Sequence, residues 1–404
     1  MASGAQGRRL RVGIIFGGRS GEHEVSLLSA ASVIRALDPA RFEAVPIGIS
    51  KDGRWVAGPA ALATLRREAH LPASGAMGAL AKARDLEDGI PTARVSLLPD
   101  PTVGGNLTPA PGAAPDLNGA WPPLDVVFPV LHGPYGEDGT VQGLLELAGV
   151  AYVGAGVLGS ALGMDKIAMK DAFRAHGLPV VNYVPVTRRA WERDREGVLD
   201  AVLAELRVPV FVKPANLGSS VGITKARERA QVAAALDLAA RFDRRLIVEE
   251  GAQDVREIEC SVLGNDEPEA SVVGEVIPSQ EFYDYRAKYI DEGSQLIIPA
   301  DLPVEVSEEL RRIAVQAFLA VDVAGMARVD FFVGHADNRI ILNELNTIPG
   351  FTSISMYPKL WEASGLSYRD LITRLIELAL ERHHDRARSE TSYDAMLCSN
   401  GGRG

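Results

Sequence analysis

Cysteine is scarce in this sequence, which has only Cys260 and Cys398 among its 404 residues. Two cysteines are too few for a disulfide framework, so a reducing compartment is expected. Cys260 lies in the apolar segment IECSVLG and is interpreted as a small buried strand residue. A structural role is therefore expected for it.

Long apolar runs and an excess of positive charge are also absent. No apolar run approaches the ~20 residues that a membrane-spanning helix requires. The first residues, MASGAQGRRLRVGIIF, lack the apolar region and the cleavage site of a signal peptide. The formal net charge of -11, without a local basic patch, disfavours a nucleic-acid partner. We therefore expect a cytoplasmic protein that binds neither membranes nor nucleic acid.

What is present is the composition of a globular protein with two or three domains. Apolar residues make up 47% and charged residues 24% of a chain that is too long for one ordinary core. Segments 10–18, 23–37 and 42–50 follow the order strand, helix, strand of a parallel α/β layer. We therefore predict a Rossmann-like first domain over residues 1–155. The region 59–120, rich in Ala, Gly and Pro, is interpreted as an insertion that is helical near LATLRREAH and otherwise loop.

Two smaller units and a tail follow the first domain. Residues 156–255 read as a small α+β domain, and residues 256–385 alternate strands with two further helices. The tail, 386–404, is polar and ends in glycines, so it is expected to be disordered. The fold class is therefore α/β with mixed α+β parts.

The segments RVDFF and NELN, separated by the turn-like GHADNR, predict a hairpin that carries Asp330, Glu344 and Asn346. The side-chain period of a strand is two, so Glu344 and Asn346 share one face. Oxygen ligands of this kind suit Mg²⁺. A solvated acidic surface is the alternative, but the apolar flanks FFV and IIL favour a buried sheet, where carboxylates need a cation or hydrogen-bonded partners.

A second motif is VKPANLGSSVGITKA, in which a strand ends near Lys213 and opens into a loop with Ser219 and Ser220. Such a loop can direct backbone N–H groups and hydroxyls at phosphate oxygens. It is not a Walker A loop, because the lysine precedes the glycines. A flexible surface loop is the alternative interpretation.

Two strand ends carry further acids. Glu249, Glu250 and, after a turn, Glu257 offer acceptors for an adenine amino group and ribose hydroxyls, although a charged surface turn explains them equally well. Glu22 and Glu24 follow the first strand, in a crevice of the kind where parallel sheets bind ligands. Glu24 is a candidate for a substrate ammonium group. Either glutamate could instead complement the dipole of the following helix.

Together these segments resemble the D-alanine–D-alanine ligase family, in the same order from residue 11 to residue 382. The matching strings are GGRSGEHEVSLLSA, LHGPYGEDGTVQGLLE, GSALGMDKIAMK, VFVKPANLGSSVGI, EFYDYRAKY, ARVDFF and NELNTIPGFTSISMYP. The resemblance implies an ATP-grasp fold and a cytoplasmic homodimer that makes D-alanyl-D-alanine for peptidoglycan synthesis.

The resemblance also implies roles for individual residues. ATP would be held by Lys170, Lys213, Ser220, Glu249, Glu250 and Glu257, and two Mg²⁺ or Mn²⁺ ions by Asp330, Glu344 and Asn346. The D-alanine substrates would be held by Glu24, His132, Lys288, Ser355 and Met356. Tyr289, on an omega loop over residues 281–295, would be linked through Ser219 to Glu24. Arg328 and the backbone N–H of Gly350 would stabilise the oxyanion.

The implied mechanism begins with phosphorylation of the first D-alanine by ATP to an acyl phosphate, because a carboxylate is a poor acylating agent. The amine of the second D-alanine then attacks the carbonyl. Ligases that use D-lactate or D-serine second are the nearest alternative, and relatives that accept D-lactate differ by a histidine where this chain has Tyr289. A non-catalytic nucleotide-binding protein is a further alternative, but it would be expected to lack a metal ligand or the arginine.

Overall fold

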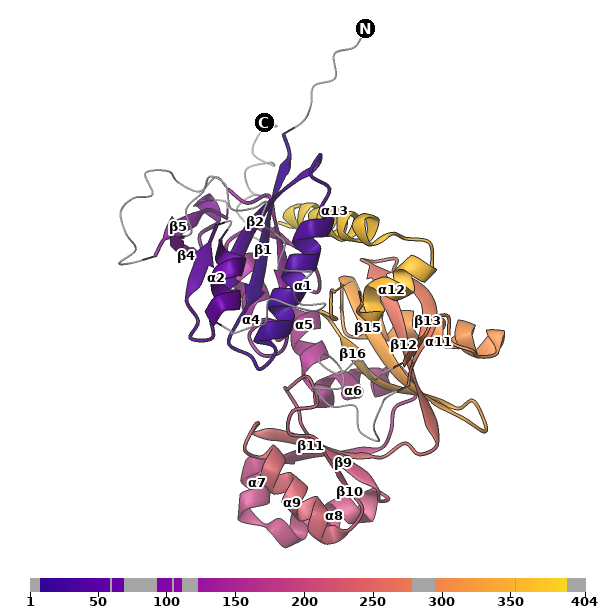
Figure 1. Cartoon of the computed structure of the whole chain (residues 1–404). Helices are drawn as coiled ribbons and strands as arrows, with labels where there is room; N and C mark the ends of the chain where they lie inside the picture. Colours follow the sequence, from indigo (N-terminus) through magenta and orange to yellow (C-terminus); the bar gives the residue numbers. More distant parts are fainter. Residues whose placement is uncertain are drawn as a thin grey trace, which may run out of the picture.

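The computed structural model describes residues 8–58, 60–68, 93–103, 105–110, 123–277, 295–352 and 354–390. Over these residues the chain forms a seven-stranded, a four-stranded and a five-stranded sheet. In Figure 1 the first sheet lies at the upper left, the second at the bottom and the third at the right. Lys288 and Tyr289, most of the predicted insertion and residues 391–404 lie outside the described residues.

The first sheet has the strand order β5-β4-β3-β2-β1-β6-β7. Strands β2, β1, β6 and β7 are parallel, as predicted, and β3 to β5 extend the sheet in antiparallel fashion. Its elements are β1 (Leu10–Gly17), α1 (His23–Ala36), β2 (Phe42–Ile49), β3 (Trp55–Ala57), α2 (Ala61–Glu68), β4 (Ala93–Leu97), the 3₁₀ helix η3 (Pro101–Val103), β5 (Leu107–Pro109), β6 (Val126–Val130), α4 (Thr140–Leu147) and β7 (Ala151–Tyr152).

One expectation for the region 59–120 is wrong. Helix α2 confirms the helical part, but β4 and β5 are strands where only loop was predicted. Both strands are short, and they gain their partners by adding to the edge at β3. Pairing of this kind depends on the neighbouring strand, so a segment of three to five residues shows little periodicity of its own.

The second sheet is wholly antiparallel, in the order β10-β9-β11-β8. Helices α7 to α9 cover one face of it and share a core with its strands, while α6 lies towards the other two sheets (Figure 1). This part comprises α5 (Val157–Met164), α6 (Lys166–Ala175), β8 (Tyr183–Thr187), α7 (Arg188–Arg193), α8 (Arg195–Glu205), β9 (Val210–Pro214), β10 (Thr224–Ala226), α9 (Arg229–Ala239) and β11 (Arg245–Glu250).

The third sheet is also antiparallel, in the order β14-β13-β12-β15-β16. Helix α11 packs against β12, β13 and β15. The elements are β12 (Val255–Gly264), β13 (Glu269–Ile277), β14 (Gln295–Ile297), α11 (Val304–Ala320), β15 (Gly325–Gly334), β16 (Ile340–Asn346), α12 (Met356–Ala363) and α13 (Tyr368–Ala387). None of the described helices is both long enough and apolar enough to cross a membrane.

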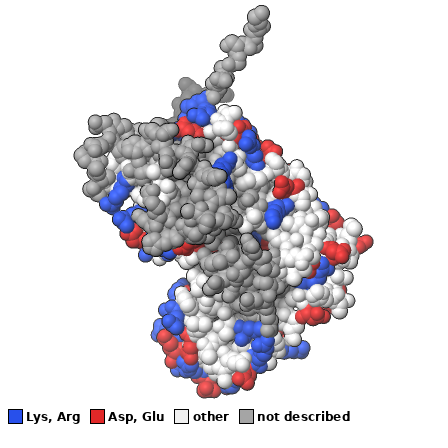
Figure 2. All heavy atoms as spheres, viewed as in Figure 1, with Lys and Arg blue, Asp and Glu red and all other residues white. Residues whose placement is uncertain are grey.

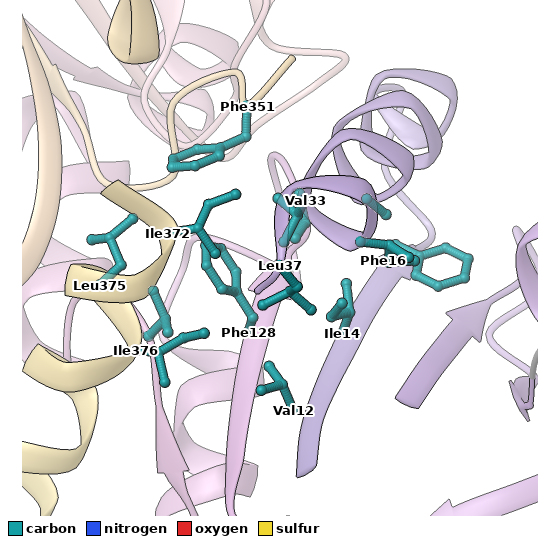
Figure 3. Packing of buried hydrophobic residues seen from close by; sticks show 14 of the residues in the cluster. Val12, Ile14, Phe16, Val33, Leu37, Phe128, Phe351, Ile372, Leu375 and Ile376 are labelled. Atoms are coloured by element: carbon teal, nitrogen blue, oxygen red, sulfur yellow. The ribbon is translucent and has the colours of Figure 1, made fainter. Parts of the chain in front are cut away.

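The last helix, α13, packs on the first sheet and shares one hydrophobic core with it. Ile372, Leu375 and Ile376 lie beside Phe128 of β6, as Figure 3 shows. Phe351 enters the same core and meets Phe128 edge to face, with ring centroids 5.7 Å apart. Arg382 of α13 adds hydrogen bonds to the carbonyls of Tyr152 and Gly154. The beginning and the end of the chain are therefore joined by one core.

On the face shown in Figure 2, Lys and Arg are interspersed with Asp and Glu, most visibly on the part that carries the second sheet. Some charged side chains pair between helices, as Arg229 of α9 does with Glu196 and Asp200 of α8. Exposed pairs of this kind contribute little to stability.

Candidate active site

A cavity of about 480 Å³ lies between the three sheets. Its wall is built from the loop after β1, the start of α6, the loop after β9, the ends of β15 and β16, and the segment that leads into α12. Nine of the predicted site residues line it: His132, Ser219, Ser220, Arg328, Glu344, Asn346, Gly350, Ser355 and Met356. Many of the residues that line the cavity were therefore among the predicted site residues.

The prediction for Glu24 is wrong, because Glu22 faces the cavity instead. The hydroxyl of Ser219 donates a hydrogen bond to the Glu22 carboxylate. Glu24 lies in the first turn of α1 and pairs with Lys51, whose Nζ is 2.5 Å from its Oε1. Residues two apart at a helix start point in different directions. The predicted link from Ser219 to Glu24 is therefore a link to Glu22.

Gly17 allows the chain to turn into this loop. Its φ of +90° lies in the left-handed region, and a Cβ there would stand 2.2 Å from the carbonyl oxygen of Ile49. Any other residue would be both strained and obstructed at this position. The turn directs the chain from the carboxyl end of β1 over the cavity, where Glu22 precedes α1.

His132 faces Glu22 from the end of β6 and is neutral in character. Its Nδ1 lies 3.0 Å from the carbonyl oxygen of Ile348, which can only accept, so Nδ1 carries the proton. Nε2 lies 3.4 Å from the hydroxyl of Ser29. Burial lowers the pKa of His132, against the opposing charge of Glu22. The side chain therefore adds no positive charge that would repel an ammonium group.

Glu137 holds two loops together at the floor of the cavity. Its carboxylate accepts hydrogen bonds from the N–H of Gly133 at 2.7 Å and from the N–H of Ile348 at 3.0 Å. Burial, together with the charge of Glu22, raises the pKa of Glu137 to about 8. The local sequence does not indicate this role of Glu137, because its partner Ile348 is more than two hundred residues away.

The loop after β9 is fastened from α6. Lys166 Nζ donates to the carbonyl of Leu217 at 2.7 Å, and Asn216 donates through its side chain to Asp165 at 3.0 Å. Ser219 and Ser220 both have positive φ, at 50° and 59°, and both line the cavity. Consecutive left-handed residues make a tight turn, which the hydrogen bond from the Val221 N–H to the Gly218 carbonyl closes at 3.2 Å. A phosphate site at this loop stays a prediction.

Behind this loop lies a buried cluster of Lys170, Lys213 and Glu249. Lys213 Nζ is 2.5 Å and Lys170 Nζ is 3.5 Å from the two carboxylate oxygens of Glu249. Burial would raise the pKa of Glu249, but both ammonium groups outweigh it and lower the pKa. Burial lowers the pKa of Lys170, and it opposes the attraction of Glu249 and Glu344 that raises the pKa of Lys213.

The carboxylate of Glu249 is therefore paired with two lysines and is not exposed at the end of β11. Its predicted contact with adenine is therefore not supported, because the carboxylate is already paired with both ammonium groups. Glu250 is partly exposed and accepts a hydrogen bond from the side chain of Asn182 at 3.1 Å. Contacts of Glu250 and Glu257 with adenine and ribose stay predictions.

The acidic hairpin forms as predicted from β15 and β16. Asp330 is the register partner of Glu344, and Arg328 is the partner of Asn346, so all four side chains share one face. Asn346 Nδ2 donates to Asp330 at 3.0 Å. Arg328 donates to both oxygens of Asp330 at 2.7 Å and lies 3.0 Å from Glu259.

This donor set fits a magnesium ion. Two carboxylates and one amide oxygen come from adjacent strands in register, and the remaining positions of an octahedral site suit phosphate oxygens and water. Among the described residues, no three His, Cys, Asp or Glu side chains are gathered so as to hold a metal by themselves. A metal at this hairpin would therefore need the amide of Asn346 and ligands from a nucleotide.

The segment between β16 and α12 completes the wall. Gly350 lies between Ile348, which is held by Glu137 and His132, and Phe351, which is held by the core. Ser355 precedes α12, and its hydroxyl lies 2.7 Å from that of Thr352. Gly350, Thr352 and Ser355 therefore line the cavity from a segment that is held on both sides of Gly350.

The sequence matches two protein families, described as D-ala D-ala ligase N-terminus over residues 11–155 and D-ala D-ala ligase C-terminus over residues 172–377. A D-alanine–D-alanine ligase of Natranaerobius thermophilus is 47% identical over 96% of this chain and 99% of its own length. A D-alanine–D-alanine ligase of Heliobacterium modesticaldum is 48% identical over 94% of this chain and 97% of its own length.

Solved structures agree with this likeness. The D-alanine–D-alanine ligase of Coxiella burnetii has a TM-score of 0.75 and 35% identity, covering 96% of this chain and 97% of that one. The D-Ala:D-Ser ligase VanG of Enterococcus faecalis has a TM-score of 0.76 and 34% identity, covering 92% of this chain and 100% of that one. The two scores are nearly equal, so the fold does not distinguish the two kinds of acceptor.

Proposed function

Because this chain belongs to the D-alanine–D-alanine ligase family, we propose that it joins two D-alanine molecules to D-alanyl-D-alanine with the consumption of ATP. The observation that carries this proposal is the cavity itself. In its wall, Glu22, Ser219 and His132 are combined with three residues of the β15–β16 hairpin. These are Arg328, Glu344 and Asn346. The product would serve peptidoglycan synthesis. A homodimer in the cytoplasm is part of the proposal and rests on the family alone.

The ammonium group of the first D-alanine would bind to Glu22. This carboxylate lies in the cavity wall and is oriented by the hydroxyl of Ser219. His132, neutral and fixed by Ile348, lines the same pocket without competing for the carboxylate as a cation. The geometry thus supports recognition of an amino acid by its ammonium group.

Asp330, Glu344 and Asn346 would hold Mg²⁺ or Mn²⁺, with Lys170 and Lys213 close behind the phosphate loop. When bound, the metal would neutralise charge on the phosphate groups during transfer. Glu249 keeps both lysines charged and in place within a buried environment. Two ions are proposed, a number that rests on the family alone.

Arg328 and the N–H of Gly350 would stabilise the oxyanion formed when the amine of the second D-alanine attacks the acyl phosphate. Arg328 is held by Asp330 and Glu259, and the segment around Gly350 is held by Glu137 and Phe351. Donors that are fixed before the reaction cost no reorganisation when charge develops. Loss of phosphate then leaves the dipeptide.

The test is phosphate release and product analysis with purified protein, ATP and Mg²⁺. D-Alanine is compared with L-alanine, and mixtures of D-alanine with D-serine or D-lactate test the second position. We expect D-alanyl-D-alanine almost exclusively. The Tyr289→His variant should gain D-alanyl-D-lactate synthesis below about pH 7, where an unperturbed histidine becomes charged. Release that is equal with L-alanine would overturn the proposal.

A further inference from the structure

Three cationic side chains of the described residues line the cavity, and two of them are already engaged. Lys166 donates to the carbonyl of Leu217 at 2.7 Å. Arg328 is paired with Asp330 and Glu259. Lys359, on α12, is the third, and among the described residues its ammonium group has no ion-pair or hydrogen-bond partner. Its charge is therefore available to a ligand.

The position of Lys359 directs this charge to the start of α12. Its backbone N–H bonds to the carbonyl of Ser355, so the two residues lie one turn apart on the same side of the helix. Helical side chains lean towards the N-terminus of their helix. Lys359 thus extends over Ser355 and Thr352, whose hydroxyls lie 2.7 Å apart. An ammonium group and two hydroxyls are thereby brought to the same part of the cavity wall.

The charges of the wall show why such a group is needed. Glu22, Glu259 and Glu344 line the cavity, so an anionic ligand enters a region that is rich in carboxylates. The first D-alanine loses its carboxylate charge when it becomes an acyl phosphate, but the second keeps its carboxylate throughout. The wall also contains Val276 and Leu296, which pack with Met356 of α12 and offer apolar contact to a small side chain.

We propose that Lys359 binds the carboxylate of the second amino acid and makes a carboxylate a requirement for the acceptor. This inference rests on the proposed function and deepens it. It concerns a residue of α12 and is separate from Lys288, which the family resemblance assigns to substrate binding. A charge-assisted hydrogen bond to a carboxylate selects strongly against an acceptor that lacks it.

The test compares D-alanine with D-alaninamide as the acceptor. The amide has the same amine and methyl group but no carboxylate, and it cannot be activated, so it enters only the second position. Both products, D-alanyl-D-alanine and D-alanyl-D-alaninamide, are quantified from one mixture. For Lys359→Met we expect the preference for D-alanine over the amide to fall by about 10-fold or more, chiefly through KM of the acceptor. Lys359→Arg should keep most of the preference.

Matched controls separate this role from a structural one. Glu362→Gln, an exposed position on the same helix, alters the charge of α12 and should leave the preference unchanged. Lys359→Gln provides a second test should the methionine variant fold poorly. Equal loss of both products in the Lys359 variants would overturn the assignment of Lys359 while the proposed function stands. A wild type that makes no D-alanyl-D-alanine would overturn both proposals.

Discussion

Two junctions surround the cavity, and they are built differently. The first and third parts of the chain share an apolar core in which Ile376 of α13 packs beside Phe128 of β6. The second sheet has a separate core of its own with α7 to α9, and its phosphate loop reaches the first part through the hydrogen bond from Ser219 to Glu22. One wall of the cavity is therefore fixed by burial of apolar side chains, whereas the facing loop is positioned by polar contacts.

The largest effect on activity without an effect on stability is expected at Glu344. Glu344→Ala should reduce kcat at saturating Mg²⁺ by about 1,000-fold or more, because a metal ligand contributes several kcal/mol to transition-state stabilisation. The fold, followed by circular dichroism, should be unchanged. Glu308→Ala, on the exposed face of α11, is the control. A variant of Glu344 that kept more than about a tenth of wild-type kcat would contradict the assignment.

The apolar junction is tested by a substitution at Ile376. Ile376→Ala removes a fully buried side chain, so the free energy of unfolding should fall by about 2–5 kcal/mol. The folded fraction should keep a kcat within about twofold of wild type, because Ile376 does not line the cavity. Denaturant titration measures the effect, with Glu381→Ala on the exposed side of α13 as control. An unchanged midpoint would show that the junction is not a continuous core.

The polar junction is tested at two neighbouring carboxylates. Glu22→Gln should raise KM for the first D-alanine by about 10- to 100-fold, since it removes the charge that holds the ammonium group. Glu24→Gln should change KM by less than about threefold, because Glu24 pairs with Lys51 outside the cavity wall. Initial rates at varied D-alanine decide between them. The reverse ranking would restore the prediction made for Glu24.

The smallest expected effect concerns pH and Glu137. Burial and the charge of Glu22 raise the pKa of Glu137 in the folded protein from its ordinary value of 4.5 to about 8, so folding favours the protonated carboxyl. This contribution is complete below pH 4.5 and is lost progressively as the pH rises to about 8. Glu137→Gln should therefore show a flatter decline of thermal midpoint over that window. Parallel curves for wild type and variant would count against the shift.

Sequence reasoning succeeded where local patterns decide the structure. The β-branched runs of β1 and β6 and the alternation in β15 and β16 identify strands directly, and the glycines and serines after Lys213 predict the loop that follows β9. The hairpin itself is expected from its short turn, but the pairing of Asp330 with Glu344 depends on a bulge beside Phe331 that shifts the register by one residue. These features need no knowledge of distant parts of the chain.

Sequence reasoning failed where the structure depends on the direction of a side chain or on contacts between residues far apart in the sequence. Glu22 and Glu24 differ only in their place at the start of α1, and each residue along a helix turns the side chain by about 100°. Glu137 and Lys359 acquire their surroundings from elements far along the chain. Nothing in the local sequence of α13 indicates that its apolar side covers the first sheet rather than the third.

The packing of α13 has a consequence for synthesis on the ribosome. The face of the first sheet that carries Val12, Ile14 and Phe128 is covered in part by Ile372, Leu375 and Ile376, which are made last. At a synthesis rate of about 5–20 residues per second, β6 emerges roughly 10–50 s before its covering helix. During that interval an apolar surface faces the solvent. The nascent chain is thus exposed to aggregation until translation is nearly complete, and truncation before α13 would leave it so permanently.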